Sequence, residues 1–255
     1  MSILINDPWK FQCIAHRGLR KLYPENTLLA FKKAIEAKAT MLELDVQMTK
    51  DQVVVVLHDA TLQRLANVRQ YVSEMSWKEL NQISLYDKQA QHVRQGKVLT
   101  LKKLFQKIGK QTNYYVEIKA FKKHSSQYRR LLCDSVVDLI YRYDLLKHVM
   151  IVSFDFEILS YLYNHYKPLH LGFNFEKHWP THNRMSTLRR MHAVLCPQEC
   201  LLDDHHLRLS QEKGFRIIPW VVNKTKNMQR FIENQVDGII TDYPDRLYEA
   251  KKLGP

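Results

Sequence analysis

Four short stretches of the sequence place ionisable side chains at or directly after the ends of apolar runs. They are His16-Arg17, Glu43-Leu44-Asp45, His58-Asp59 and Glu117-Ile118-Lys119. If these runs are strands, residues two apart face the same side, so Glu43 and Asp45 lie together. Two carboxylates that close raise each other's pKa unless a cation lies between them. A hard divalent ion, which prefers oxygen ligands, would remove this conflict.

Besides Asp59, the four stretches supply three carboxylates, two imidazoles, an arginine and a lysine. This combination suits a phosphate ester, because a bound cation and the basic side chains would neutralise the phosphoryl oxygens. The imidazoles could accept and donate protons near neutral pH. One such histidine alone is more often structural, but the whole set at successive strand ends favours a catalytic site.

The rest of the sequence alternates between short apolar runs and segments with helical spacing such as Thr27–Lys38. The eight expected strands are Phe11–Ala15, Met41–Val46, Tyr114–Ile118, Val149–Phe154, Leu169–Phe173, Ala193–Cys196, Phe215–Val222 and Gly238–Thr241. Eight strands separated by helices predict an α/β fold, a closed TIM (β/α)8 barrel, with residues 1–255 as a single domain. An open doubly wound sheet is the alternative, but the first strand is not followed by G-x-G-x-x-G.

The longest break in this alternation is Asp59–Lys97, which follows the buried run Val53–Leu57. It contains a predicted short helix, Trp77–Ile83, and a polar run, Asp87–Lys97. A loop of this length usually has a function or covers a site. We therefore expect a barrel with one longer loop after its second strand.

The composition is that of a globular protein, with 45% hydrophobic and 25% charged residues in a chain of 255. No window reaches the roughly 18 apolar residues that span a bilayer. The first residues, Met1–Trp9, lack a basic n-region and have only a short apolar stretch, so we expect no secretory leader. These features predict a cytoplasmic protein without a transmembrane segment.

The four cysteines are irregularly spaced, which favours free thiols over disulfides. They are Cys13, Cys133, Cys196 and Cys200. A zinc site built from the last two with His192, His205 and His206 is a weaker alternative, because the spacing is not C-x-x-C.

The 39 lysines and arginines exceed the 26 acidic residues, so the formal net charge is +13. The basic residues are scattered through helical patterns, which is typical of a solvated outer face. No nucleic-acid-binding signature accompanies them, so we expect no nucleic-acid partner. Peripheral contact with an anionic membrane stays open, and the sequence does not indicate an oligomeric state.

An ordered series of motifs lies between about residues 12 and 247: I-A-H-R-G, P-E-N-T-L-L-A-F, L-E-L-D-V-Q-M-T-K-D, V-V-V-L-H-D-A-T-L, V-E-I-K, I-V-S-F-D and V-D-G-I-I-T-D-Y-P-D. In this order they resemble the glycerophosphodiester phosphodiesterase family. The resemblance implies a TIM barrel that hydrolyses glycerophosphodiesters to glycerol 3-phosphate and an alcohol, with one divalent cation. Mg²⁺, Ca²⁺ and Mn²⁺ all accept three carboxylates.

Carried over motif by motif, the resemblance implies a role for each strand-end residue. The catalytic histidines would be His16 and His58, the metal ligands Glu43, Asp45 and Glu117, and the phosphate-binding residues Arg17 and Lys119. Trp220 resembles the family's aromatic residue on a late strand, and a place in the barrel core is the alternative. Phe154 and Phe173, at two strand ends, could form an apolar wall for the alcohol group or pack in the core.

Two departures from the family pattern and two weaker candidates remain. Ala37-Lys38-Ala39-Thr40 stands where relatives have a glycine-containing turn, so a non-glycine residue there would adopt the left-handed conformation at a cost of roughly 1 kcal/mol. Residues 66–71 replace the usual Asn-Gly turn near the substrate entrance. Glu25 could support the site, and Asp242 is expected to cap the final helix.

We therefore predict a metal-dependent glycerophosphodiester phosphodiesterase, with His16 favoured as base and His58 as acid. One alternative is a lysophospholipase D, which would need an apolar groove for an acyl chain. A second is a catalytically silent basic barrel that binds anionic lipid or nucleic acid. The complete set of histidines and carboxylates argues against the second, because a protein that only binds has no need of two strand-end imidazoles.

Overall fold

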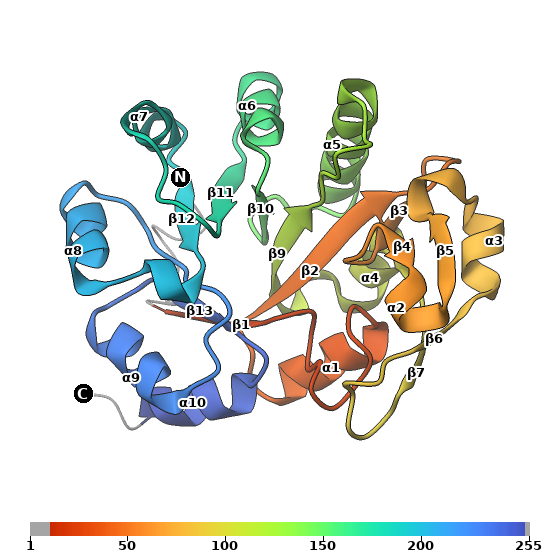
Figure 1. Ribbon diagram of the computed structural model, residues 1–255, viewed down its shortest axis with the longest axis horizontal. Coiled ribbons are helices and arrows are strands. Elements are labelled where there is room, and N and C mark those ends of the chain that lie inside the picture. Colours follow the sequence, from red (N-terminus) through yellow and green to blue (C-terminus); the bar gives the residue numbers. More distant parts are fainter. Residues whose placement is uncertain (1–10, 253–255) are drawn as a thin grey trace.

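Parallel strands ringed by helices form the framework of the computed structural model, which describes residues 11–252 (Figure 1). Residues 1–10, where no secretory leader is expected, and residues 253–255 lie outside the described residues. The strands are β1 (Gln12–Ala15), β2 (Met41–Met48), β3 (Val54–Val56), β4 (Thr61–Leu62), β5 (Val68–Tyr71), β6 (Ser84–Tyr86), β7 (Gln95–Lys97), β8 (Leu99–Thr100), β9 (Asn113–Ile118), β10 (Val149–Ser153), β11 (His170–Phe175), β12 (Val194–Pro197) and β13 (Gly238–Thr241). The helices are α1 (Leu28–Glu36), α2 (Gln63–Ala66), α3 (Trp77–Gln82), α4 (Leu101–Ile108), α5 (Ser126–Arg142), α6 (Phe156–His165), α7 (His182–Arg190), α8 (Asp204–Glu212), α9 (Thr225–Glu233) and α10 (Pro244–Lys252).

The main sheet confirms the predicted barrel, with the parallel order β12-β11-β10-β9-β2-β1-β13. The predicted strand Phe215–Val222 is wrong as a regular strand. This segment makes only the isolated bridges Leu195↔Ile217 and Gln198↔Trp220 to the β12 side. On its other side, the Val222 amide donates to the Ile240 carbonyl over 2.9 Å. Pro219 has no N–H to continue a ladder, yet the segment still fills the place between β12 and β13 and closes the barrel.

Side chains on the two faces of each barrel strand belong to two different apolar layers. Leu44 belongs to the large cluster between strands and helices, whereas Tyr115 and Cys196 belong to a smaller cluster inside the barrel. Because successive residues face opposite sides, Glu43 and Asp45 must point away from the layer that contains Leu44. The packing of the helices therefore fixes which side chains of β2 face the interior.

The long break after the barrel's second strand forms an insertion with its own structure, at the right of Figure 1. β3 pairs antiparallel with β2, and the insertion continues through β4, α2, β5, α3, β6 and β7. Leu62, Leu65, Val72 and Leu80 are all buried in an apolar cluster that belongs to this part of the chain. The insertion is thus an ordered element with its own core.

The first helix begins and ends near positions that local chemistry favours. The Thr27 side chain accepts a hydrogen bond from the Ala30 amide and caps α1. After the helix, Lys38 has φ +67° and confirms the expected left-handed residue in this turn.

Within residues 11–252, no helix is both long enough and apolar enough to cross a membrane.

Candidate active site

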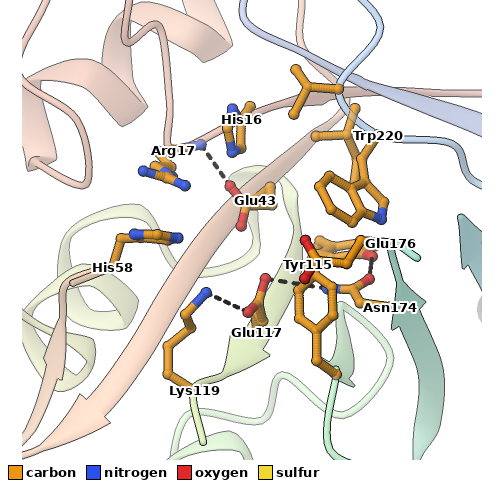
Figure 2. Close-up of a pocket in the computed structure, with 13 residues that line it drawn as sticks. His16, Arg17, Glu43, His58, Tyr115, Glu117, Lys119, Asn174, Glu176 and Trp220 are labelled. Carbon is orange, nitrogen blue, oxygen red and sulfur yellow. Dashed lines mark hydrogen bonds and ion pairs between the residues drawn. The ribbon is translucent and has the colours of Figure 1, made fainter. Parts of the chain in front are cut away.

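One cavity of about 470 Å³ opens among the carboxyl ends of the barrel strands. Its walls carry the side chains of His16, His58, Glu43, Glu117 and other residues from both ends of the chain (Figure 2). The carboxyl ends of parallel strands meet at one edge of a barrel. Groups far apart in the sequence are therefore presented to the same space.

Three carboxylates converge beside this cavity. Glu43, Asp45 and Glu117 are buried, and each offers an oxygen within 4.8 Å of those of the other two. The register of β2 and β9 places Asp45 directly opposite Glu117. Burial and the charge of Asp45 raise the pKa of Glu43 well above its ordinary value. A cation with oxygen ligands would relieve this repulsion, so the donor set fits a hard metal ion.

Two basic side chains already contact these carboxylates. Lys119 Nζ donates to Glu117 Oε1 over 2.6 Å and lies 3.3 Å from Asp45 Oδ1. Arg17 Nε lies 3.3 Å from Asp45 Oδ2, and the Arg17 backbone N–H donates to Glu43 over 2.7 Å. Burial raises the pKa of Asp45, but Lys119 and Arg17 outweigh it and lower that pKa overall.

The turn after β1 explains how the Arg17 amide reaches Glu43. Arg17 has φ +54° and Gly18 has φ +79°. A Cβ on Gly18 would lie 2.7 Å from the carbonyl carbon of Ala30. A glycine is therefore required for the chain to turn this tightly against α1.

His16 and Asp242 form one histidine–carboxylate pair. His16 Nδ1 and Asp242 Oδ1 are 2.7 Å apart, and both side chains are largely buried. Burial lowers the pKa of His16 to about 4, although the hydrogen bond with Asp242 acts in the opposite direction. Burial raises the pKa of Asp242, but His16, Arg20 and Asn223 together outweigh burial, so the pKa is lowered. An ionised Asp242 can only accept, so the proton lies on Nδ1 and Nε2 has a free lone pair.

His58 and Asp59 form a second, more exposed pair. His58 Nδ1 and Asp59 Oδ1 are 2.6 Å apart, with 32% and 29% of their side chains exposed. Burial raises the pKa of Asp59, but the hydrogen bonds with His58 and Arg64 lower it to about 2. Asp59 is therefore ionised at neutral pH and orients the imidazole as Asp242 orients His16.

Comparison with known proteins identifies the family of this protein. The model of the "Glycerophosphoryl diester phosphodiesterase family" matches residues 16–246. The chain belongs to this family. It is 30% identical over 247 residues to a glycerophosphodiester phosphodiesterase of Caldanaerobacter subterraneus subsp. tengcongensis, which covers 94% of this chain and 98% of the relative.

Solved structures of a glycerophosphodiester phosphodiesterase and of another phosphodiesterase share the fold. A glycerophosphodiester phosphodiesterase from Thermotoga maritima is 28% identical, with a TM-score of 0.76 over 93% of this chain and 97% of that one. A phosphodiesterase from Oleispira antarctica, solved with the product sn-glycerol-3-phosphate, has a TM-score of 0.83 and 19% identity. That match covers 94% of this chain and 96% of the other. The family fold thus extends over almost all of the chain.

The structure brings together nearly all of the residues that the sequence singled out. His16, Arg17, Glu43, His58, Glu117, Lys119, Phe154 and Trp220 line the cavity, and Asp45 lies in the carboxylate cluster. Phe154 meets Trp220 edge to face at 5.4 Å, and the Trp220 indole N–H donates to the Cys196 carbonyl. These two rings form one apolar wall of the cavity.

Of the two alternatives for Phe173, the structure favours packing in the core over lining the wall. Its ring is buried in the cluster between strands and helices, where it meets Phe156 at 5.8 Å and Phe175 at 5.8 Å. Phe173 has the opposite parity on β11 to Asn174, which does line the cavity. The alternation of the strand therefore sends the phenylalanine outward.

The zinc alternative also lacks support in the structure. Cys196 is buried inside the barrel, and Cys200 is exposed. Within residues 11–252 the group of converging metal-ligating side chains is the carboxylate cluster described above. None of the four cysteines forms a disulfide there.

Several site residues escaped the sequence analysis. Asn174 donates from Nδ2 to Glu117 Oε2 over 3.1 Å, and the Asn26 amide donates to Asp45 over 2.9 Å. Glu176 points into the cavity near Trp220 (Figure 2). Strand alternation could have found Asn174 and Glu176, which have one parity. Asp242, expected as a helix cap, instead accepts from His16 and from Asn223.

Proposed function

We propose that this protein is a metal-dependent phosphodiesterase that hydrolyses glycerophosphodiesters to glycerol 3-phosphate and an alcohol. The observation that carries this proposal is the carboxylate cluster beside the two histidine–carboxylate pairs in one cavity. The family name and the product-bound relative support this class of substrate. The extent of the family match also supports one catalytic domain, and the unpaired cysteines fit a cytoplasmic location.

Glu43, Asp45 and Glu117 would hold one divalent cation, Mg²⁺, Ca²⁺ or Mn²⁺. When bound, it would polarise the phosphoryl group and balance the charge of the carboxylates. Arg17 and Lys119 would bind the phosphoryl oxygens and stabilise the charge that develops on them. Both side chains are held in place beforehand by the carboxylates that they contact.

His16 serves as the base and His58 as the acid. Burial keeps His16 neutral at pH 7 with its Nε2 lone pair available. It can accept the proton of the attacking hydroxyl, that of water or of the glycerol group, as the hydroxyl oxygen bonds to phosphorus. As the bond between phosphorus and the alcohol oxygen breaks, His58 donates a proton to that oxygen. Asp242 and Asp59 fix the ring orientations and stabilise the positive charge of each imidazolium.

The test is an assay with glycerophosphocholine and with lysophosphatidylcholine, each with and without added cation. We expect cation-dependent release of glycerol 3-phosphate from glycerophosphocholine and much slower turnover of the lysophospholipid. Faster release of lysophosphatidic acid would indicate a lysophospholipase D instead. No turnover of either substrate, with binding to anionic vesicles, would support the silent basic barrel and contradict the proposal.

A further inference from the structure

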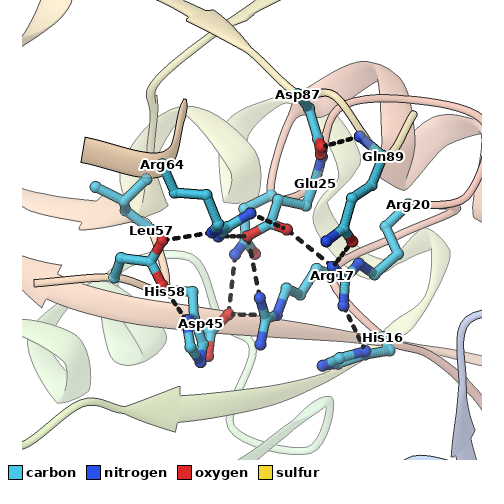
Figure 3. Close-up of polar contacts among 12 residues, drawn as sticks. His16, Arg17, Arg20, Glu25, Asp45, Leu57, His58, Arg64, Asp87 and Gln89 are labelled. Carbon is cyan, nitrogen blue, oxygen red and sulfur yellow. Dashed lines mark hydrogen bonds and ion pairs between the residues drawn. The ribbon is translucent and has the colours of Figure 1, made fainter. Parts of the chain in front are cut away.

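The insertion after β3 reaches the site through one arginine. Arg64, on α2, donates from Nη2 to Glu25 Oε1 over 2.7 Å and from Nη1 to Glu25 Oε2 over 3.0 Å. Its third nitrogen, Nε, donates to Asp59 Oδ2 over 2.7 Å. One guanidinium therefore joins the partner of His58 to a carboxylate from the loop before α1. Figure 3 shows Arg64 beside Glu25.

Glu25 gives this contact a fixed anchor. The Glu25 side chain is only 1% exposed, and it also accepts from Arg17 over 3.0 Å and from Arg20 over 3.2 Å. Burial raises its pKa, but the arginines outweigh burial and keep it ionised. The Glu25 backbone N–H donates to Asp87 Oδ2 over 3.2 Å, so the insertion also holds this residue from its main chain. A buried charge held on all sides has little freedom to move.

The Asp59 side chain depends on the contact with Arg64, because the other hydrogen bonds in this region hold only the main chain. Gln47 Nε2 donates to the carbonyls of Leu57 and Asp59, which holds the main chain around His58. The Asp59 carboxylate is partly exposed, and its contacts are His58 and Arg64. Without Arg64 this carboxylate would rotate in solvent, and the imidazole would lose its orientation.

We propose that Arg64 is a positioning residue for catalysis, which holds Asp59 against His58 by tying it to the buried Glu25. The inference rests on the proposed function and extends it, because it makes the insertion a part of the catalytic apparatus. An arginine suits this task and a lysine does not, since only the planar fork can bind two carboxylates in fixed directions.

The first test compares Arg64→Gln with Lys78→Gln. Lys78 is an exposed basic residue on α3 of the same insertion, and its side chain makes no ion pair within residues 11–252. We expect Arg64→Gln to lower kcat by about 10- to 100-fold, the scale for residues that orient a functional group. The KM and the melting temperature should change little, and Lys78→Gln should match the wild type. Equal kcat values for the two variants would overturn the proposal.

A second test separates positioning from a structural role. In an Asp59→Asn background, Arg64→Gln should change kcat by no more than about twofold, because the route to His58 is already broken. Guanidinium ion, added below denaturing concentrations, should restore part of the kcat of Arg64→Ala but not of His58→Ala. Persistence of the full effect without Asp59, or absence of rescue together with a lower melting temperature, would contradict the proposal. An inactive wild-type enzyme would overturn the proposed function, whereas a fully active Arg64→Gln variant would overturn only this inference.

Discussion

The two histidines of the site are held by different parts of the molecule. His16 stands at the end of β1 and meets Asp242, 226 positions away and just after β13, so the barrel itself forms this pair. His58 meets the next residue in the chain, and that pair is fixed from outside by Arg64 of the insertion. The His16 side chain is 12% exposed and that of His58 is 32% exposed. The barrel thus provides one buried, rigid imidazole, and the insertion orients a second one that solvent reaches.

The largest effect on activity is expected when either imidazole is removed. We expect His16→Ala and His58→Ala each to lower kcat for glycerophosphocholine by roughly 10² or more, because each removes a general acid or base. Steady-state assays of both variants provide the measurement. His206→Ala, which changes a half-buried histidine paired with Asp203, serves as the control. Turnover like that of the wild type in either catalytic variant would remove that histidine from the mechanism.

Replacement of the two partner carboxylates tests the difference in burial between the His16–Asp242 pair and the His58–Asp59 pair. Asp242→Asn and Asp59→Asn should each lower kcat by about 10- to 100-fold, because each frees an imidazole. Asp242 is the more buried, so Asp242→Asn should also cost about 1–3 kcal/mol of stability. Asp59→Asn should cost less than about 1 kcal/mol. Urea unfolding of both variants would show this, and equal losses of stability would contradict the contrast in burial.

The low pKa of His16 predicts how stability depends on pH. Its folded pKa of about 4 lies below the ordinary value of 6.5, so the unfolded chain takes up this proton first as the pH falls. The stabilisation is complete above about pH 6.5 and is lost as the pH falls towards 4. Between pH 7 and 5, the wild type should lose about 2 kcal/mol more than His16→Gln in urea unfolding. Parallel losses in the two proteins would show that His16 is not buried as described.

The smallest effect is expected at the aromatic wall. Phe154 borders the cavity and is exposed, whereas Phe173 is buried in the outer layer. Phe154→Leu should raise KM a few-fold, about 1 kcal/mol or less of binding, with stability unchanged. Phe173→Leu should leave KM unchanged and cost up to about 1.5 kcal/mol of stability. A change in KM with Phe173→Leu alone would reverse the assignment of the two rings.

The sequence predicted most of the barrel and the centre of the site because those features depend on local patterns. Apolar runs located the strands, and the two-residue period brought Glu43 and Asp45 to one face. The register between β2 and β9 then added Glu117. These residues need only regular strands in order to converge.

What the sequence could not show depends on contacts between distant segments. The carboxylate partner of His16 lies 226 positions away, and Arg64 meets Glu25 across 39. Contacts over such separations leave no periodic pattern in the sequence from which they could be predicted. The segment 215–222 was apolar like a strand, but Pro219 interrupts its hydrogen bonding. Phe173 lies near the end of its strand, which suggested a place at the cavity. The alternation of side chains along β11 instead turns it towards the helices.

The most direct test of the account is the rate of glycerol 3-phosphate release as a function of cation concentration. In the wild type, a chelator should abolish release from glycerophosphocholine, and added divalent cation should restore it along a saturating curve. Glu117→Gln should need at least about tenfold more cation for half of its maximal rate, because a charged oxygen ligand is lost. Full turnover in excess chelator, or the same cation dependence in Glu117→Gln, would contradict the assignment of the three carboxylates to a metal ion.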